Sequence, residues 1–242
     1  MAISKDIVRI LLEHGANPNV VDHNGSSPLH LASWTGDYEI VDMLISINND
    51  NNNSQPNDKK MIADINLKNK DNETALHSAC QYGHTPVVSL LLTQGADPFV
   101  QNVRQETPLD LASQYGRLET IELLLRIRFD LLNEYLPTNR NNNLNSNIRR
   151  QHSPLHLASR NGHKSIVKLL LDLGFDVNYL VITVNGTALH EAVMCGKNEV
   201  VRLLLEAGTD IRLCNDQEQK VQQLLEGLNT SVAKQTRKLI RG

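Results

Sequence analysis

Histidine and cysteine are the residue types of this sequence that could serve catalysis or metal binding, with nine and three copies. Six of the histidines recur at fixed places in a repeated stretch: four lie inside it, and two follow the glycine that ends it. These are His30, His77, His156 and His190, and then His84 and His163. A repeated slot is not a convergent site, so we interpret all six as structural. We expect the first four imidazoles to bond backbone in the neighbouring turn.

The pairings that chemistry would need are incomplete. Cys80 and His84 lie four residues apart, but no further metal ligands are nearby. Cys195 shares a repeat with His190, yet no orienting acid is placed with them. The sequence therefore predicts no enzyme, no metal site and no cofactor.

Charge and hydropathy exclude two classes of partner. Lys and Arg number 24 against 27 Asp and Glu, a formal net charge of −3, which lacks the basic footprint of a nucleic-acid-binding protein. The sequence has no apolar run of about 18 residues, so we expect no membrane insertion. An odd, sparse set of cysteines predicts a reducing compartment, and we place the protein in the cytoplasm.

A ten-residue motif repeats five times and organises the chain. The copies are SPLHLASWTG, TALHSACQYG, TPLDLASQYG, SPLHLASRNG and TALHEAVMCG. Their leucines at 29, 76, 109, 155 and 189 are spaced by 47, 33, 46 and 34 residues. The base period is therefore 33, with insertions after the first and third copies.

Each copy predicts a helix–turn–helix unit. A Ser or Thr stands at the N-cap, proline often follows at the first helical position, and a glycine tolerant of left-handed backbone ends the first helix. The caps are Ser27, Thr74, Thr107, Ser153 and Thr187, and the glycines are Gly36, Gly83, Gly116, Gly162 and Gly196. A second helix with a dense apolar stripe follows in every unit.

Motifs of the TPLH type at this spacing are typical of ankyrin repeats, which the chain resembles. The resemblance implies an all-α solenoid of stacked helix–turn–helix units with a C-terminal helical cap, because no unit can bury its apolar faces alone. We expect one domain, 1–242, divided as follows: a partial repeat at 1–22, repeats at 23–69, 70–102, 103–148, 149–182 and 183–216, and a cap at 217–242. The partial repeat suggests that the sequence begins inside a repeat. The Asn-rich insertions, roughly 46–62 and 133–150, are interpreted as polar surface loops.

Longer stretches resemble one group of ankyrin proteins. Residues 71–92, 105–125 and the last two repeats are similar to the Odin and AIDA scaffolds, which combine ankyrin repeats with SAM and PTB domains; the Caskin scaffolds are the second choice. The tail departs from the Odin pattern, with QKVQQ in place of a TALD-like motif. The resemblance implies a scaffold or adaptor in Eph-type receptor tyrosine kinase or synaptic signalling. Any link to those receptors would run through SAM and PTB domains that this sequence does not contain.

The expected partner is another protein, bound by the loop tips and first helices of the concave face. Trp, Tyr and Arg dominate binding hot spots, and repeat register places several of them there. The predicted binding residues are Trp34, Tyr82, Arg104, Tyr115, Arg149, Arg150, Arg160 and Met194. The alternative for the aromatic residues is packing between adjacent helices. We expect a monomer; the alternative function is substrate recruitment within a ubiquitin ligase or phosphatase complex.

Overall fold

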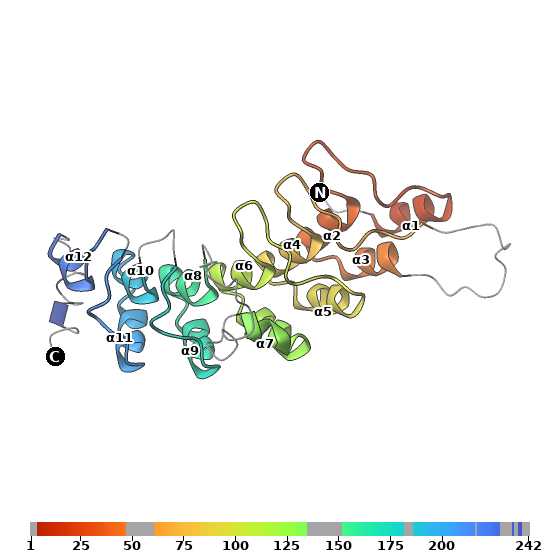
Figure 1. Ribbon diagram of the computed structural model, residues 1–242. Coiled ribbons are helices and arrows are strands. Elements are labelled where there is room, and N and C mark those ends of the chain that lie inside the picture. The colour runs from red at the N-terminus through yellow and green to blue at the C-terminus, as the bar shows by residue number, and fades with distance from the viewer. Residues whose placement is uncertain are drawn as a thin grey trace, which may run out of the picture. The chain divides into compact units, whose positions relative to one another are not determined.

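A computed structural model describes residues 4–46, 61–134, 152–181, 186–215, 217–227, 234 and 237–238 (Figure 1). Its elements are almost all helices. In chain order these are α1 Lys5–Glu13, α2 Pro28–Thr35, α3 Tyr38–Ile45, α4 Ala75–Tyr82, α5 Thr85–Thr93, α6 Pro108–Gln114, α7 Leu118–Ile127, the 3₁₀ helix η1 Phe129–Glu134, α8 Pro154–Asn161, α9 Lys164–Asp172, α10 Ala188–Met194, α11 Asn198–Glu206 and α12 Val221–Gly227. Extended pairing within the described ranges is limited to isolated bridges.

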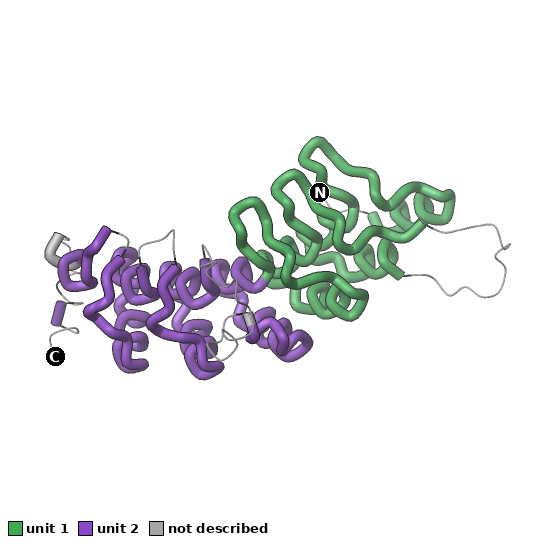
Figure 2. Tube along the Cα trace, viewed as in Figure 1, with its two compact units in different colours: residues 1–108 green, residues 109–242 purple. Residues whose placement is uncertain are grey.

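The chain forms two compact units, residues 1–108 and 109–242 (Figure 2). In unit 1, α1 precedes the helix pairs α2/α3 and α4/α5; in unit 2, the pairs α6/α7, α8/α9 and α10/α11 precede α12. The expected all-α repeat fold is confirmed, and the described residues include a lone first helix, successive helix pairs and a helix of the predicted cap. The finer division into numbered repeats stays a prediction.

The motif residues start and stop the first helices as expected. Pro28, Pro108 and Pro154 are first helical residues, where a missing amide hydrogen costs nothing. All five motif glycines have positive φ, between 66° and 84°. At Gly36 a side chain would also strike the ring of His84, so this turn requires glycine for two separate reasons.

Within each unit, the core lies between the two helices of a pair and between neighbouring pairs. All five motif leucines are at most 1% exposed, and Leu124 and Leu170 on the second helices are fully buried. α1 has no buried residue: Ile7 and Leu11 are more than half exposed, whereas Ile40 and Leu44 at the matching positions of α3 are buried. This contrast fits a second helix on which no first helix of the same repeat packs within the described residues.

Hairpin loops join successive repeats. At the described tips, an Asp or Asn side chain holds the turn by hydrogen bonds to backbone amides. The Oδ1 atom of Asn69 accepts the amides of Asp71 and Glu73, both at 2.9 Å. The same pair of hydrogen bonds recurs at Asp22, Asn102 and Asn215. In unit 1 the tips lie side by side (Figure 2), since Lys70 N–H donates to Asn24 and Val103 N–H to Asp71.

The insertions and the chain end lie mostly outside the described residues, which include neither 47–60 nor 135–151. The structure adds η1 at the start of the second insertion, where Leu131 and Leu132 are buried. Their burial stabilises this turn, which packs against α7. The second helix expected in the cap, after Gly227, also falls largely outside the described ranges.

Candidate functional site

The motif histidines link neighbouring repeats, because each imidazole bonds the backbone of the next repeat, as the sequence predicted. At His77 the Nδ1 atom lies 3.1 Å from the Thr74 amide nitrogen and 3.0 Å from the Thr74 hydroxyl. The Nε2 atom lies 3.3 Å from the Glu106 carbonyl oxygen in the next hairpin. His30 and His190 repeat this arrangement, with Nε2 at 2.9 Å from Glu73 O and 3.3 Å from Gln219 O.

These partners fix the protonation state of the imidazole. A backbone amide at Nδ1 requires an acceptor there, and a carbonyl at Nε2 requires a donor, so only the neutral Nε2–H form satisfies both. Burial lowers the pKa of His77 to about 4, and burial also lowers the pKa values of His30 and His190. The histidines therefore act as neutral cross-links and not as catalytic bases.

His156 is the exception among the four. Its Nε2 atom bonds the Gly186 carbonyl at 3.1 Å, but its buried Nδ1 atom has no hydrogen-bond partner within the described residues. Ser153 at the cap has a more extended φ, −141° against −85° at Ser27, and does not close the capping box seen in α2. Burial again lowers the pKa of His156 to about 4.

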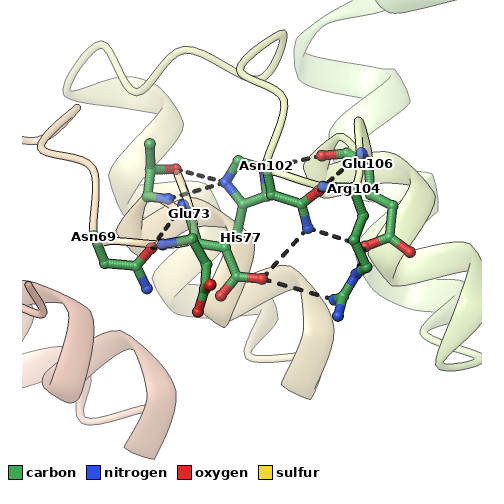
Figure 3. A network of polar contacts seen from close by, with 8 residues as sticks. Asn69, Glu73, His77, Asn102, Arg104 and Glu106 are labelled. Carbon is green, nitrogen blue, oxygen red and sulfur yellow. Dashed lines mark hydrogen bonds and ion pairs between the residues drawn. The ribbon is translucent and has the colours of Figure 1, made fainter. Parts of the chain in front are cut away.

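A polar network connects two hairpin tips of unit 1 (Figure 3). The Glu106 carboxylate is buried and accepts hydrogen bonds from Asn102 Nδ2 at 2.9 Å and Arg104 Nε at 2.7 Å. Glu73 Oε1 lies 3.4 Å from Asn102 Nδ2 and 4.0 Å from the Arg104 guanidinium. The network holds Arg104, a predicted binding residue, at the surface with its side chain 61% exposed.

Sequence reasoning missed this anchoring of Arg104. The signal was an Asx residue followed four positions later by Glu or Gln, which recurs as Asn69–Glu73, Asn102–Glu106 and Asn215–Gln219. The spacing reflects a tight turn in which the Asx oxygen takes two backbone amides. At Asn102 the tip also carries a charged partner, because Arg104 Nε donates to the Glu106 carboxylate.

Trp34 and Tyr82 come together on the first helices of unit 1. Their ring centroids are 6.0 Å apart at an interplanar angle of 84°, an edge-to-face contact. The two residues are nevertheless 52% and 42% exposed. The packing alternative therefore holds for this pair. The exposed parts of both rings leave their role in binding a prediction.

In unit 2 the predicted residues Tyr115, Arg160 and Met194 are all exposed on or next to the first helices. Beside Arg160, the Glu191 carboxyl is buried, and burial raises the pKa of Glu191 against the opposing charge of Arg160. Arg149 and Arg150 lie outside the described residues. A role in binding stays a prediction for all of these residues.

Other chemistry finds no site in the described parts of the chain. No three His, Cys, Asp or Glu residues there are grouped to hold a metal ion. Cys80 is buried, which raises the pKa of its thiol, while Cys195 and Cys214 are free and exposed. No helix of these parts has the length and apolar character needed to cross a membrane.

Family comparisons match nearly all of the repeat region. A family model described as ankyrin repeats (three copies) matches residues 57–131 and 128–215, and one described as ankyrin repeats (many copies) matches residues 4–45. A solved ankyrin repeat domain, that of Bcl-3, superposes with a TM-score of 0.66 at 24% identity, covering 98% of this chain and 91% of that one. At that identity the likeness concerns the fold alone.

Curated relatives share single stretches of the chain. Ankyrin repeat and SAM domain-containing protein 1A of Homo sapiens is 44% identical over 110 residues, which is 35% of this chain and 9% of that protein. Ankyrin repeat and sterile alpha motif domain-containing protein 1B of Danio rerio is 41% identical over 112 residues, with shares of 37% and 9%. Ankyrin repeat and SOCS box protein 3 of Homo sapiens is 33% identical over 92 residues, with shares of 38% and 16%. The chain thus spans less than a fifth of each of these relatives.

Proposed function

Because the chain belongs to the ankyrin-repeat family, whose repeats are protein–protein interaction modules, we propose that it is a non-catalytic scaffold or adaptor module. Its binding surface consists of the exposed residues of the first helices and hairpin tips within each unit. In unit 1 these are Trp34, Tyr82 and Arg104, and in unit 2 Tyr115, Arg160 and Met194.

The half-exposed aromatic pair of unit 1 carries this proposal. A tryptophan that is 52% exposed leaves apolar area in water, which a partner surface would bury favourably. The ring is held in place by Tyr82, so little side-chain freedom is lost on binding. Tryptophan, tyrosine and arginine are the residue types whose truncation weakens interfaces most.

Affinity capture tests the proposal when parent and variants are compared side by side. The immobilised chain is exposed to cell extract as parent, as Trp34→Ala/Tyr82→Ala, and as Lys168→Ala. Lys168 is an exposed residue of α9, a second helix, and serves as the matched control. We expect specific proteins that the parent and the control retain and the double variant loses. Equal retention by all three would place the binding surface elsewhere.

The pathway proposed is Eph-type receptor tyrosine kinase or synaptic signalling in the cytoplasm. Similarity to two relatives whose names include a SAM domain, at 44% and 41% identity, supports this choice. Substrate recruitment within a ubiquitin ligase is the second candidate, supported by a relative whose name includes a SOCS box. The full-length transcript distinguishes them: SAM and PTB domains favour the first, a SOCS box or F-box the second.

A further inference from the structure

Three side chains form an exposed apolar patch on the first helices of unit 1. Leu31 and Trp34 stand three residues apart on α2, which puts them on one face, and Tyr82 joins them from α4. Their exposed fractions are 40%, 52% and 42%. We call these three residues the aromatic patch.

Contacts behind the aromatic patch hold it rigid. The Tyr82 ring stacks on the His84 ring at an interplanar angle of 15°, with centroids 6.3 Å apart. His84 Nε2 in turn lies 3.0 Å from the Trp34 carbonyl oxygen. Tyr82 and Trp34 are therefore positioned before any partner arrives. Both residues are about half exposed, and an aromatic ring attracts a cation.

The charge of unit 1 favours a cationic ligand. Its described residues, 4–46 and 61–108, include eleven Asp and Glu but only five Lys and Arg. Ion pairs take up three charges of each sign: Lys5 with Glu39, Arg9 with Asp6, and Arg104 with Glu106. Eight Asp and Glu then stand against two Lys among these described residues. A surface with this excess of negative charge attracts basic segments and repels acidic ones and nucleic acid.

We propose that unit 1 binds a basic segment of a partner protein, whose Arg or Lys side chain packs on the aromatic patch. The proposal rests on the function proposed above and adds the chemistry of the partner. The acidic surroundings raise the encounter rate and select against acidic partners, while the rings supply the short-range contact. Asp71, exposed at a hairpin tip of the same unit, is one source of the attracting charge.

A random twelve-residue peptide library, displayed on phage and selected on the chain, tests the proposal. Parallel selections use the parent and Trp34→Ala/Tyr82→Ala. We expect the peptides enriched on the parent to carry net positive charge with Arg or Lys, and to be lost on the double variant. Trp34 is the sole tryptophan, so its fluorescence then reports binding of the most enriched peptide directly at the patch.

Single variants sharpen the result. Trp34→Phe and Asp71→Lys should each weaken the enriched peptide, and Tyr82→Ala by about tenfold, the scale of a cation–aromatic contact that excludes water. Phe129→Ala, which removes an exposed aromatic of unit 2, should leave its affinity unchanged. For the variants that lack Trp34, binding is measured by the fluorescence of a fluorescein-labelled peptide.

Two outcomes would overturn the inference. One is enrichment of neutral or acidic peptides, which would show that the patch is used without charge selection; the function proposed above would still stand on the capture experiment. The other is enrichment that is equal on the parent and the double variant, or absent on both. That result would show that the aromatic patch does not bind basic segments. Whether the patch is a binding surface at all is decided separately, by the loss of captured proteins in the same double variant.

Discussion

Acid should weaken unit 1 through the buried imidazole of His77. Its pKa is about 4 in the folded chain, below the ordinary value of 6.5. A histidine with a lowered folded pKa contributes stability that is complete above pH 6.5 and is lost as the pH falls toward 4, because the unfolded chain binds the proton first. For these two pKa values the loss between pH 7 and pH 5 is roughly 2 kcal/mol.

The perturbation that isolates this effect is His77→Gln, measured by urea unfolding at pH 7 and pH 5. Trp34 lies in the same unit and is the sole tryptophan, so its fluorescence reports unfolding there. At pH 7 the substitution should cost about 1–3 kcal/mol, since it removes the bonds to the Thr74 amide and the Glu106 carbonyl. Between pH 7 and pH 5 the variant should lose about 2 kcal/mol less than the parent.

Taking the difference between variant and parent cancels the contribution of the carboxylates to the pH dependence of the free energy of unfolding, because the carboxylates titrate in both proteins. His23→Gln is the matched control, because His23 is exposed at a hairpin tip. This control should reproduce the pH dependence of the parent. If His77→Gln and the parent lose the same free energy on acidification, the neutral cross-link assigned to this imidazole is wrong.

Three further perturbations probe packing, turns and loops. Leu124→Ala and Leu170→Ala, both fully buried, should each cost roughly 2–5 kcal/mol in chemical denaturation; a cost below about half a kilocalorie would contradict the packing of the second helices in the core. Gly36→Ala should cost more than Gly95→Ala, because both have positive φ but only the new methyl at position 36 strikes the His84 ring; equal losses of thermal stability would remove the steric argument. Deleting residues 49–60 or 138–148 from the Asn-rich insertions should leave the melting temperature nearly unchanged, since polar surface loops contribute little packing, and a large drop would mean that the loops dock on the repeats.

The repeat architecture was predictable because its signals are local and repeated. Pro28 and Gly36 mark the ends of one short helix within ten residues, and four further copies confirm the register. The cross-linking role of His77 also followed from its recurrence, since a motif position that is histidine in every repeat but one is expected to serve the fold. What recurs at a fixed period is therefore readable without knowledge of tertiary contacts.

Contacts that depend on one pair of side chains were not predictable in this way. The anchoring of Arg104 by Glu106 requires a folded hairpin tip. In it, both the Arg104 guanidinium and the Asn102 amide donate to the Glu106 carboxylate. The stacking of Tyr82 on His84, and the bond from His84 to the Trp34 carbonyl, join segments up to 50 residues apart. Repeat register placed these residues on one surface but could not show which of them hold the others.

The binding residues of the two units can be tested one by one once a partner has been captured. The measurement is the dissociation constant of that partner for the parent, for Trp34→Ala, Tyr82→Ala, Tyr115→Ala and Arg160→Ala, and for the outer-helix control Lys168→Ala, with folding of each variant checked by circular dichroism. We predict that true anchors weaken binding by roughly 2 kcal/mol or more and that the control changes almost nothing. Parent-like affinity in all four variants would contradict the assignment of the first-helix surface as the binding site.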